Sequence, residues 1–155
     1  MTSATYDIRN VTEDCRDLIA LRRAWHPGDD EGFEDRLHAW WERERHQRRA
    51  VVAYEDDAPV GMANAQIFSR MPAPGKPDAR WLYVANVYVL DSHRRRGIGS
   101  ALTLDLVDFA RANGMVRVVL APSPMSIPMY QSLGFRPADD LMRLDMPMQE
   151  TPWHA

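Results

Sequence analysis

At the centre of this sequence is a short basic stretch, Arg94-Arg95-Arg96-Gly97-Ile98-Gly99-Ser100. It lies between an apolar run at 84–90 and a helical pattern at 101–113. A strand, a glycine-rich loop and a helix in this order can bind a phosphate, because the first N–H groups of the helix have no partner within it and lie at the positive end of its dipole. The glycines permit unusual backbone angles and close approach of a ligand, and the arginines suit phosphate oxygens. The stretch therefore predicts a phosphate-binding loop; the alternative is a solvated basic surface turn.

The glycine spacing excludes two common phosphate loops. The dinucleotide fingerprint requires G-x-G-x-x-G, and the P-loop requires a Lys followed by Ser or Thr after its second glycine. Neither pattern is present here, where the spacing is Arg94-x-x-Gly97-x-Gly99.

This spacing resembles the acyl-CoA pyrophosphate loop of the GNAT superfamily of N-acetyltransferases. Two further stretches carry the resemblance: Asn86-Val87-Tyr88-Val89 looks like the fourth strand of that family, and Tyr130-Gln131-Ser132-Leu133-Gly134-Phe135 looks like its closing Tyr-x-x-x-Gly-Phe segment. The close resemblance covers 86–135. It implies an α/β fold in a single N-acetyltransferase domain over 1–155, with a mixed central sheet of about six to seven strands flanked by about four helices, and with 147–155 as a C-terminal tail.

Composition sets outer limits on the function. A chain of 155 residues suits one domain, and a formal net charge of −3 argues against a nucleic-acid-binding protein. Cys15 is the only cysteine, so an internal disulfide is impossible, and we interpret it as a buried residue of the first helix. The first ten residues lack a signal pattern, and no run reaches the ~20 apolar residues of a membrane span. We therefore expect a cytoplasmic protein that does not bind a membrane.

Hydrophobic periodicity predicts the elements around the loop. We expect Thr12 to cap the first helix, Asp56-Asp57 to form a hairpin turn, and Asn113-Gly114 to end the helix after the loop. Trp40 and Trp41 are interpreted as core residues of the second helix. Strands are expected at 6–9, 49–55, 59–68, 81–89, 117–120 and 142–146, the last because Met142, Leu144 and Met146 alternate with charged residues.

The resemblance implies how acetyl-CoA binds. The backbone of Val87, Tyr88 and Val89 would hold the pantetheine arm as an added strand, and the N–H of Val87, near a strand bulge, would stabilise the oxyanion. The phosphate loop would hold the pyrophosphate, with either Arg94 or Arg95 reaching the nucleotide phosphates. The residues of this loop are Arg94, Arg95, Arg96, Gly97, Ile98, Gly99 and Ser100.

The place of Tyr130 in the resembled segment implies that it is the general acid, because a phenol of pKa ~10 is protonated at neutral pH and can donate to a thiolate. The alternative is a core tyrosine on an apolar helix face. The general base is less defined, since 81–89 contains no carboxylate. Two candidates are open: a water relay through Asn86 and backbone carbonyls, and a carboxylate of the acidic cluster around 29–35. His93 is a weaker candidate, and we interpret it instead as a solvent-facing loop residue. Ser123 and Ser126 either order water and Tyr130 or act as turn and cap residues.

Asp29, Asp30 and Glu31 lie between the first two predicted helices. Either they are solvated helix-end charges, or, as the resemblance implies, they line the acceptor site and select a cationic acceptor. The resemblance and these residues together predict an acetyl-CoA-dependent N-acetyltransferase without a metal. It would act on an amine of a small molecule or peptide by direct attack in a ternary complex. A homodimer is common in the family that the chain resembles. The alternative is a module that binds acyl-CoA without turnover.

Overall fold

One mixed sheet of five strands forms the centre of the computed structural model, which describes residues 6–147. The strands lie in the order β1-β2-β3-β4-β5; β1 to β4 pair antiparallel, and β5 pairs parallel to β4. Their bounds are β1 Asp7–Asn10, β2 Arg48–Glu55, β3 Ala58–Ser69, β4 Arg80–Val89 and β5 Val118–Leu120. The helices are α1 Arg16–Trp25, α2 Phe33–Glu44, α3 Ile98–Ala112 and α4 Ile127–Ser132.

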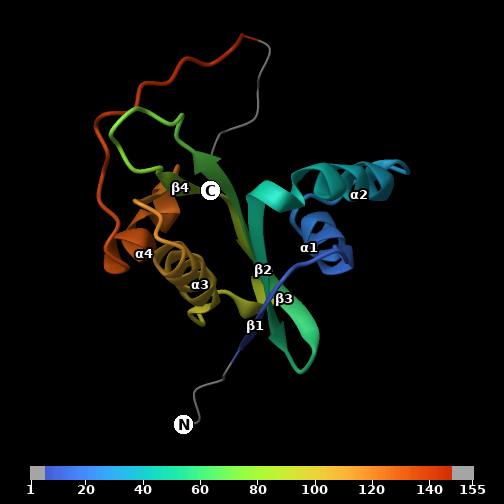
Figure 1. Cartoon of the computed structure of the whole chain (residues 1–155). Coiled ribbons are helices and arrows are strands. Elements are labelled where there is room, and N and C mark those ends of the chain that lie inside the picture. The colour runs from blue at the N-terminus through green and yellow to red at the C-terminus, as the bar shows by residue number, and fades with distance from the viewer. Residues whose placement is uncertain (1–5, 148–155) are drawn as a thin grey trace.

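The helices lie on the two sides of the sheet. In Figure 1, α1 and α2 lie on one side, and α3 and α4 lie on the other. A core of mostly small and branched residues fills the α3 side, including Val51, Leu82 and Leu102. A second core around Leu21 and Trp41 fills the α1 and α2 side. Both faces of the sheet are therefore covered, as the apolar strand patterns require.

Several local predictions are confirmed. Asp56 and Asp57 have φ of 50° and 61°, the left-handed angles of a two-residue hairpin turn. Asn113 is the C-cap of α3, and Gly114 follows with φ of 66°. Cys15 is 1% exposed and lies just before α1.

The prediction that Thr12 caps the first helix is wrong. The helix begins at Arg16, and the side chain of Asp14 accepts the Arg16 N–H at 3.0 Å. The Thr12 carbonyl instead accepts the indole N–H of Trp41 at 2.6 Å, which ties the start of this segment to α2. Trp41 is 1% exposed, so its interpretation as a core residue is confirmed.

The expected strand at 142–146 is absent from the described residues, so the sheet has five strands there rather than six or seven. Met142 and Leu144 are 96% and 84% exposed, and the segment after α4 runs away from the sheet (Figure 1). Strand formation needs a hydrogen-bonding neighbour as well as an alternating pattern. The expected tail at 147–155 lies, after Pro147, outside the described residues. Within residues 6–147, no helix combines the length and apolar character of a membrane span.

A β-bulge in β4 interrupts the alternation of the strand. Asn64 pairs with Asn86 but Ala65 pairs with Val84, so Ala85 is an extra residue on β4. Leu82 and Val84 contribute to the α3-side core before the bulge, whereas Tyr88 contributes to the opposite core after it. The bulge therefore turns Asn86 and Tyr88 toward α1 and α2.

Candidate active site

The phosphate loop predicted from the sequence has the backbone of an anion site. Gly97 precedes α3 with φ of 80°, and Arg95 also has a positive φ, 63°, which residues with a Cβ rarely adopt. Ala101 is the first residue of α3 whose N–H bonds back to the loop, to the Gly97 carbonyl at 3.0 Å. The N–H groups of Ile98, Gly99 and Ser100 before it are the ones that a helix start leaves for a ligand. Gly99 itself lies within regular helix, so its backbone does not require a glycine.

The three arginines of the loop have different surroundings. Arg94 pairs with Asp91 at 2.9 Å and lies 3.4 Å from the Val89 carbonyl. Arg96 lies 3.9 Å from Glu55. Arg95 has no ion-pair partner within residues 6–147, so its guanidinium is available to an anion.

His93 does not face solvent as expected. Its Nε2 lies 2.5 Å from the Glu55 carboxylate, and its side chain is 20% exposed. Since Glu55 ends β2, this contact ties the phosphate loop to the sheet. His93 is a structural residue of the loop in this arrangement.

The second half of β4 has an open edge. β5 pairs with β4 only up to Val84, so 85–89 has no neighbour on that side within the described residues. The Leu82 N–H bonds toward β5, to the Arg117 carbonyl, whereas the Leu90 N–H bonds toward β3, to the Val60 carbonyl. Backbone groups alternate in direction along a strand, so the bulge at Ala85 changes the direction, and the N–H and C=O groups of Val87 and Val89 point to the open edge. This is the orientation that an extended pantetheine arm needs.

Tyr130 lies on α4 and is 2% exposed. Its ring packs edge-on against Phe135, with ring centroids 5.7 Å apart. Burial raises the pKa of the Tyr130 phenol to about 12, so the phenol stays protonated at neutral pH. Among residues 6–147 its hydroxyl forms no hydrogen bond, which leaves the proton available to a ligand.

Ser126 forms hydrogen bonds only to its own turn. The Ser126 hydroxyl donates to the Ser123 carbonyl at 2.9 Å, and the Ser123 hydroxyl donates to the Ser126 oxygen at 3.0 Å. Ser126 occupies the position before α4, but its side chain does not cap the helix. These contacts favour the turn role over a role in catalysis.

A cavity of about 350 Å³ lies between the helices and the sheet on the α1 and α2 side. Residues four apart on α1 and three or four apart on α2 form the helical wall, and residues of β3 and β4 form the sheet wall. Asn64 and Asn86 form its polar floor, with the Asn64 amide N–H₂ donating to the Asn86 amide oxygen at 3.1 Å. The lining residues are Leu18, Arg22, Phe33, Arg36, Leu37, Trp40, Met62, Asn64 and Asn86.

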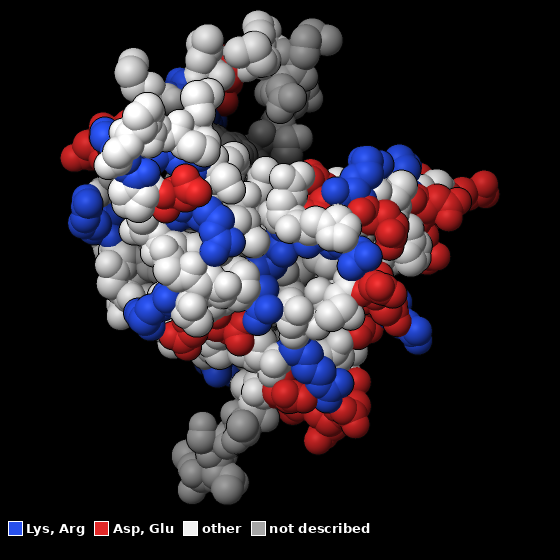
Figure 2. Space-filling view, viewed as in Figure 1, with Lys and Arg blue, Asp and Glu red and all other residues white. Residues whose placement is uncertain are grey.

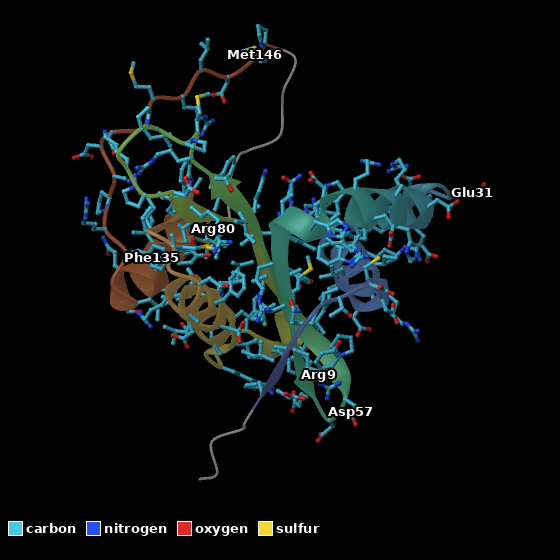
Figure 3. All side chains as sticks on the ribbon, in the orientation of Figure 1. Arg9, Glu31, Asp57, Arg80, Phe135 and Met146 are labelled. Atoms are coloured by element: carbon cyan, nitrogen blue, oxygen red, sulfur yellow. The ribbon has the colours of Figure 1, made fainter. Side chains whose placement is uncertain are left out.

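The charged side chains of this cavity differ from the acidic lining expected from the sequence. Its charged lining residues are Arg22 and Arg36, and none of Asp29, Asp30 and Glu31, all of which the structure describes, is among its lining residues. Asp30 binds the Arg36 guanidinium through both oxygens, at 2.6 and 3.0 Å. Figure 3 places Glu31 at the outer tip before α2, away from the sheet, and Figure 2 shows acidic side chains gathered at that tip. Asp29 and Glu31 are therefore exposed charges in this structure, whereas the Asp30 carboxylate is paired with Arg36.

Sequence reasoning missed Arg22 and Asn64. Arg22 lies on the same helix face as the apolar residues Cys15, Leu18 and Ile19. A cation at a position that the pattern predicts to be buried could have identified it as a site residue. Asn64 similarly interrupts the apolar run of β3, where it is 7% exposed. Trp40, interpreted as core, packs on the second core and also lines the cavity.

Comparison with known proteins gives both sequence and structural relatives. The profile of the acetyltransferase (GNAT) family matches residues 13–135. Glucosamine 6-phosphate N-acetyltransferase of Trypanosoma brucei brucei is 36% identical over 87 residues, which are 56% of this chain and 57% of that protein. The match thus spans little more than half the length of this relative.

Two crystal structures have the same fold. An acetyltransferase of Trypanosoma brucei is 28% identical and superposes with a TM-score of 0.71, covering 92% of this chain and 100% of that one. A predicted acetyltransferase of Clostridium acetobutylicum, solved with acetyl-CoA, is 16% identical with a TM-score of 0.71, covering 95% of this chain and 100% of that one. From the phosphate loop, the open edge of β4 and the match over 13–135, we conclude that this chain belongs to the GNAT acetyltransferase family.

Proposed function

We propose that this protein transfers an acetyl group from acetyl-CoA to the amine of a small molecule. One observation carries the proposal: the bulge in β4 points the backbone of Val87 and Val89 to an open sheet edge and places Asn86 on the floor of the adjacent cavity. A donor bound along the edge and an acceptor bound in the cavity would therefore meet at the bulge.

The loop and the strand would hold the donor. The helix-start N–H groups of Ile98, Gly99 and Ser100, with Gly97 giving the turn, suit the pyrophosphate. Because Arg95 has no ion-pair partner in residues 6–147, we assign it rather than Arg94 to the nucleotide phosphates. Val87 and Val89 would form hydrogen bonds with the pantetheine amides, with Tyr88 between them packed on the other face of the strand.

The reaction forms a C–N bond and breaks the thioester C–S bond. The amine attacks the acetyl carbonyl carbon, and the Val87 N–H would stabilise the negative charge that develops on the carbonyl oxygen. Tyr130 would give its proton to the departing CoA thiolate. Since no carboxylate is among the cavity's described lining residues, the amine would lose its proton to water ordered by Asn64 and Asn86.

The first test is Tyr130→Phe. If Tyr130 is the general acid, kcat should fall by about 10²- to 10⁴-fold, while the rise in Tm caused by acetyl-CoA stays at the wild-type value. Tyr6→Phe, a change at the β1 side of the molecule, is the matched control and should retain wild-type kcat. CoA release should be measured with a panel of amines that starts with glucosamine 6-phosphate, the substrate in the name of the relative from Trypanosoma.

Two outcomes would contradict the proposal. An unchanged kcat in Tyr130→Phe would remove Tyr130 as the acid. Binding of acetyl-CoA without release of CoA on any amine would favour a module that binds acyl-CoA without turnover.

A further inference from the structure

Arg22 is a cation without a counter-ion in the cavity wall. Within residues 6–147 its guanidinium forms no ion pair, and its Nη1 is buried without a hydrogen-bond partner. The guanidinium lies over the Trp25 ring, whose centroid is 5.0 Å from the Arg22 guanidinium carbon. By contrast, the Arg36 guanidinium is neutralised by both oxygens of Asp30. Arg22 therefore supplies the uncompensated positive charge of this cavity.

A buried guanidinium N–H group without a hydrogen-bond partner is unfavourable, and an anion within reach relieves that cost. The described lining of the cavity contains no carboxylate that could do so. Burial also lowers the pKa of Arg22, which shows the same lack of compensation. A ligand that brings its own anion would complete the pair.

Asn64 supplies an unused acceptor on the opposite, sheet wall. Its side-chain Nδ2 is occupied by Asn86, but its Oδ1 is buried without a hydrogen-bond partner. A carbonyl oxygen of this kind accepts from an amine N–H. The cavity thus has an unpartnered cation on its helical wall and an unpartnered acceptor beside the bulge. The aromatic rings of Phe33 and Trp40, both on α2, also line it.

We propose that the acyl acceptor is a small amine that also carries an anionic group, a carboxylate or a phosphate monoester. The anion pairs with Arg22, the amine N–H donates to Asn64 Oδ1, and the apolar body of the molecule lies against Phe33 and Trp40. A volume of about 350 Å³ suits a small-molecule acceptor. This inference rests on the proposed function and names its substrate class.

Matched pairs of acceptors test the inference on the wild-type protein. One pair is an aminohexose and its phosphate monoester, and the other is an amino acid and its methyl ester; a polyamine represents cationic acceptors. The anionic member of at least one pair should have a kcat/KM more than tenfold above that of its neutral partner. A preference in the first pair would indicate a phosphate on the acceptor, and a preference in the second would indicate a carboxylate. Transfer to neutral or cationic amines with equal or higher kcat/KM would overturn the inference and leave the proposed function intact. Transfer to no amine would overturn both.

Substitution of Arg22 tests the role of the residue itself. In Arg22→Gln the ratio of kcat/KM between the anionic and neutral members should fall at least tenfold, mainly through KM of the anionic acceptor, and Arg22→Lys should restore part of it. KM for acetyl-CoA should not change. Arg16→Gln is the matched control on the same helix, because Arg16 is 79% exposed and pairs with Asp14; it should keep the wild-type ratio. An unchanged ratio in folded Arg22→Gln would overturn the inference, and if that variant does not fold, the wild-type pairs decide.

Discussion

Two residues of the phosphate loop, Arg95 and Gly97, have left-handed backbone angles, and the conformational free energy of this angle differs between them. Gly97 adopts φ of 80° without a steric penalty because it has no Cβ. Arg95 adopts φ of 63° with a full side chain, which is unfavourable unless the surroundings hold it there. Gly114, after α3, has a similar φ of 66° but lies at the other end of the helix.

Comparing alanine variants of Gly97 and Gly114 distinguishes the effect of backbone strain from an effect on ligand binding. Gly97→Ala and Gly114→Ala should each lower the free energy of unfolding by about 1–2 kcal/mol, because alanine is strained at these angles. Only Gly97→Ala should also reduce the rise in Tm that acetyl-CoA causes, since a shift of this loop moves the N–H groups at the start of α3. Denaturant titration and thermal unfolding with acetyl-CoA measure the two effects. Equal responses to acetyl-CoA in both variants would exclude the loop backbone as the binding element.

Single residues were predictable where the signal is local. The left-handed backbone angle of Gly97 and the position of Tyr130 on a helix after the last strand follow from short motifs. The position of Asn86 does not, because it depends on the extra residue at Ala85 and on the partner strand β3. The unpaired state of Arg22 depends on which carboxylates fold near it, and that is a property of the tertiary structure.

At the scale of elements, α3 packs very closely on the sheet at Gly61. A Cβ on Gly61 would lie 3.1 Å from the Tyr88 carbonyl oxygen and 3.2 Å from side-chain carbons of Ile98 and Leu102. These contacts are shorter than ordinary van der Waals separations. The glycine thus lets the helix that carries the phosphate loop approach β3 and β4.

Gly61→Ala should therefore destabilise the protein by about 1–3 kcal/mol through overpacking. Gly28→Ala is the matched control, because a Cβ there would have no neighbour within 4 Å, and it should change stability by less than about 0.5 kcal/mol. Urea titration with an unchanged m-value is the measurement. Equal stability of the two variants would show that α3 can move away without cost.

The predicted elements were correct in type for β1 to β5 and for the four helices. The exception is 142–146, where alternation predicted a strand. Alternation of apolar and charged residues indicates which side chains would share a face of a strand, but it does not show that a neighbouring strand is present to pair with it. The start of α1 was also misplaced, because Thr12 and Asp14 are both suitable cap residues and only the fold distinguishes them.

At the scale of the whole molecule, folding buries phenols as well as hydrocarbon: Tyr130 is 2% exposed, and Tyr54 is partly buried against the second core. Burial and, for Tyr54, a hydrogen bond to Asp17 raise the pKa values of Tyr130 and Tyr54 to about 12. In the unfolded chain a phenol titrates near a pKa of ~10. The native protein therefore holds these protons over a range in which the unfolded chain releases them.

Stability should accordingly be insensitive to these phenols below pH 10 and should fall between about pH 10 and 12. Above pH 10 the unfolded state is favoured by ionisation, with a slope of up to about 1.4 kcal/mol per pH unit for each buried phenol. Tyr130→Phe should reduce this alkaline slope, and Tyr54→Phe should reduce it further. Urea unfolding at a series of pH values measures the slope, and an identical slope in wild type and both variants would contradict the buried titration.

The burial of Cys15 has a practical consequence for enzymology. This thiol is 1% exposed, and burial raises its pKa, so the reactive thiolate is scarce and shielded in the native protein. As the sequence contains no other cysteine, a disulfide dye added to a reaction mixture would report free CoA with little background from the protein. The colour change in such an assay can then be equated with turnover.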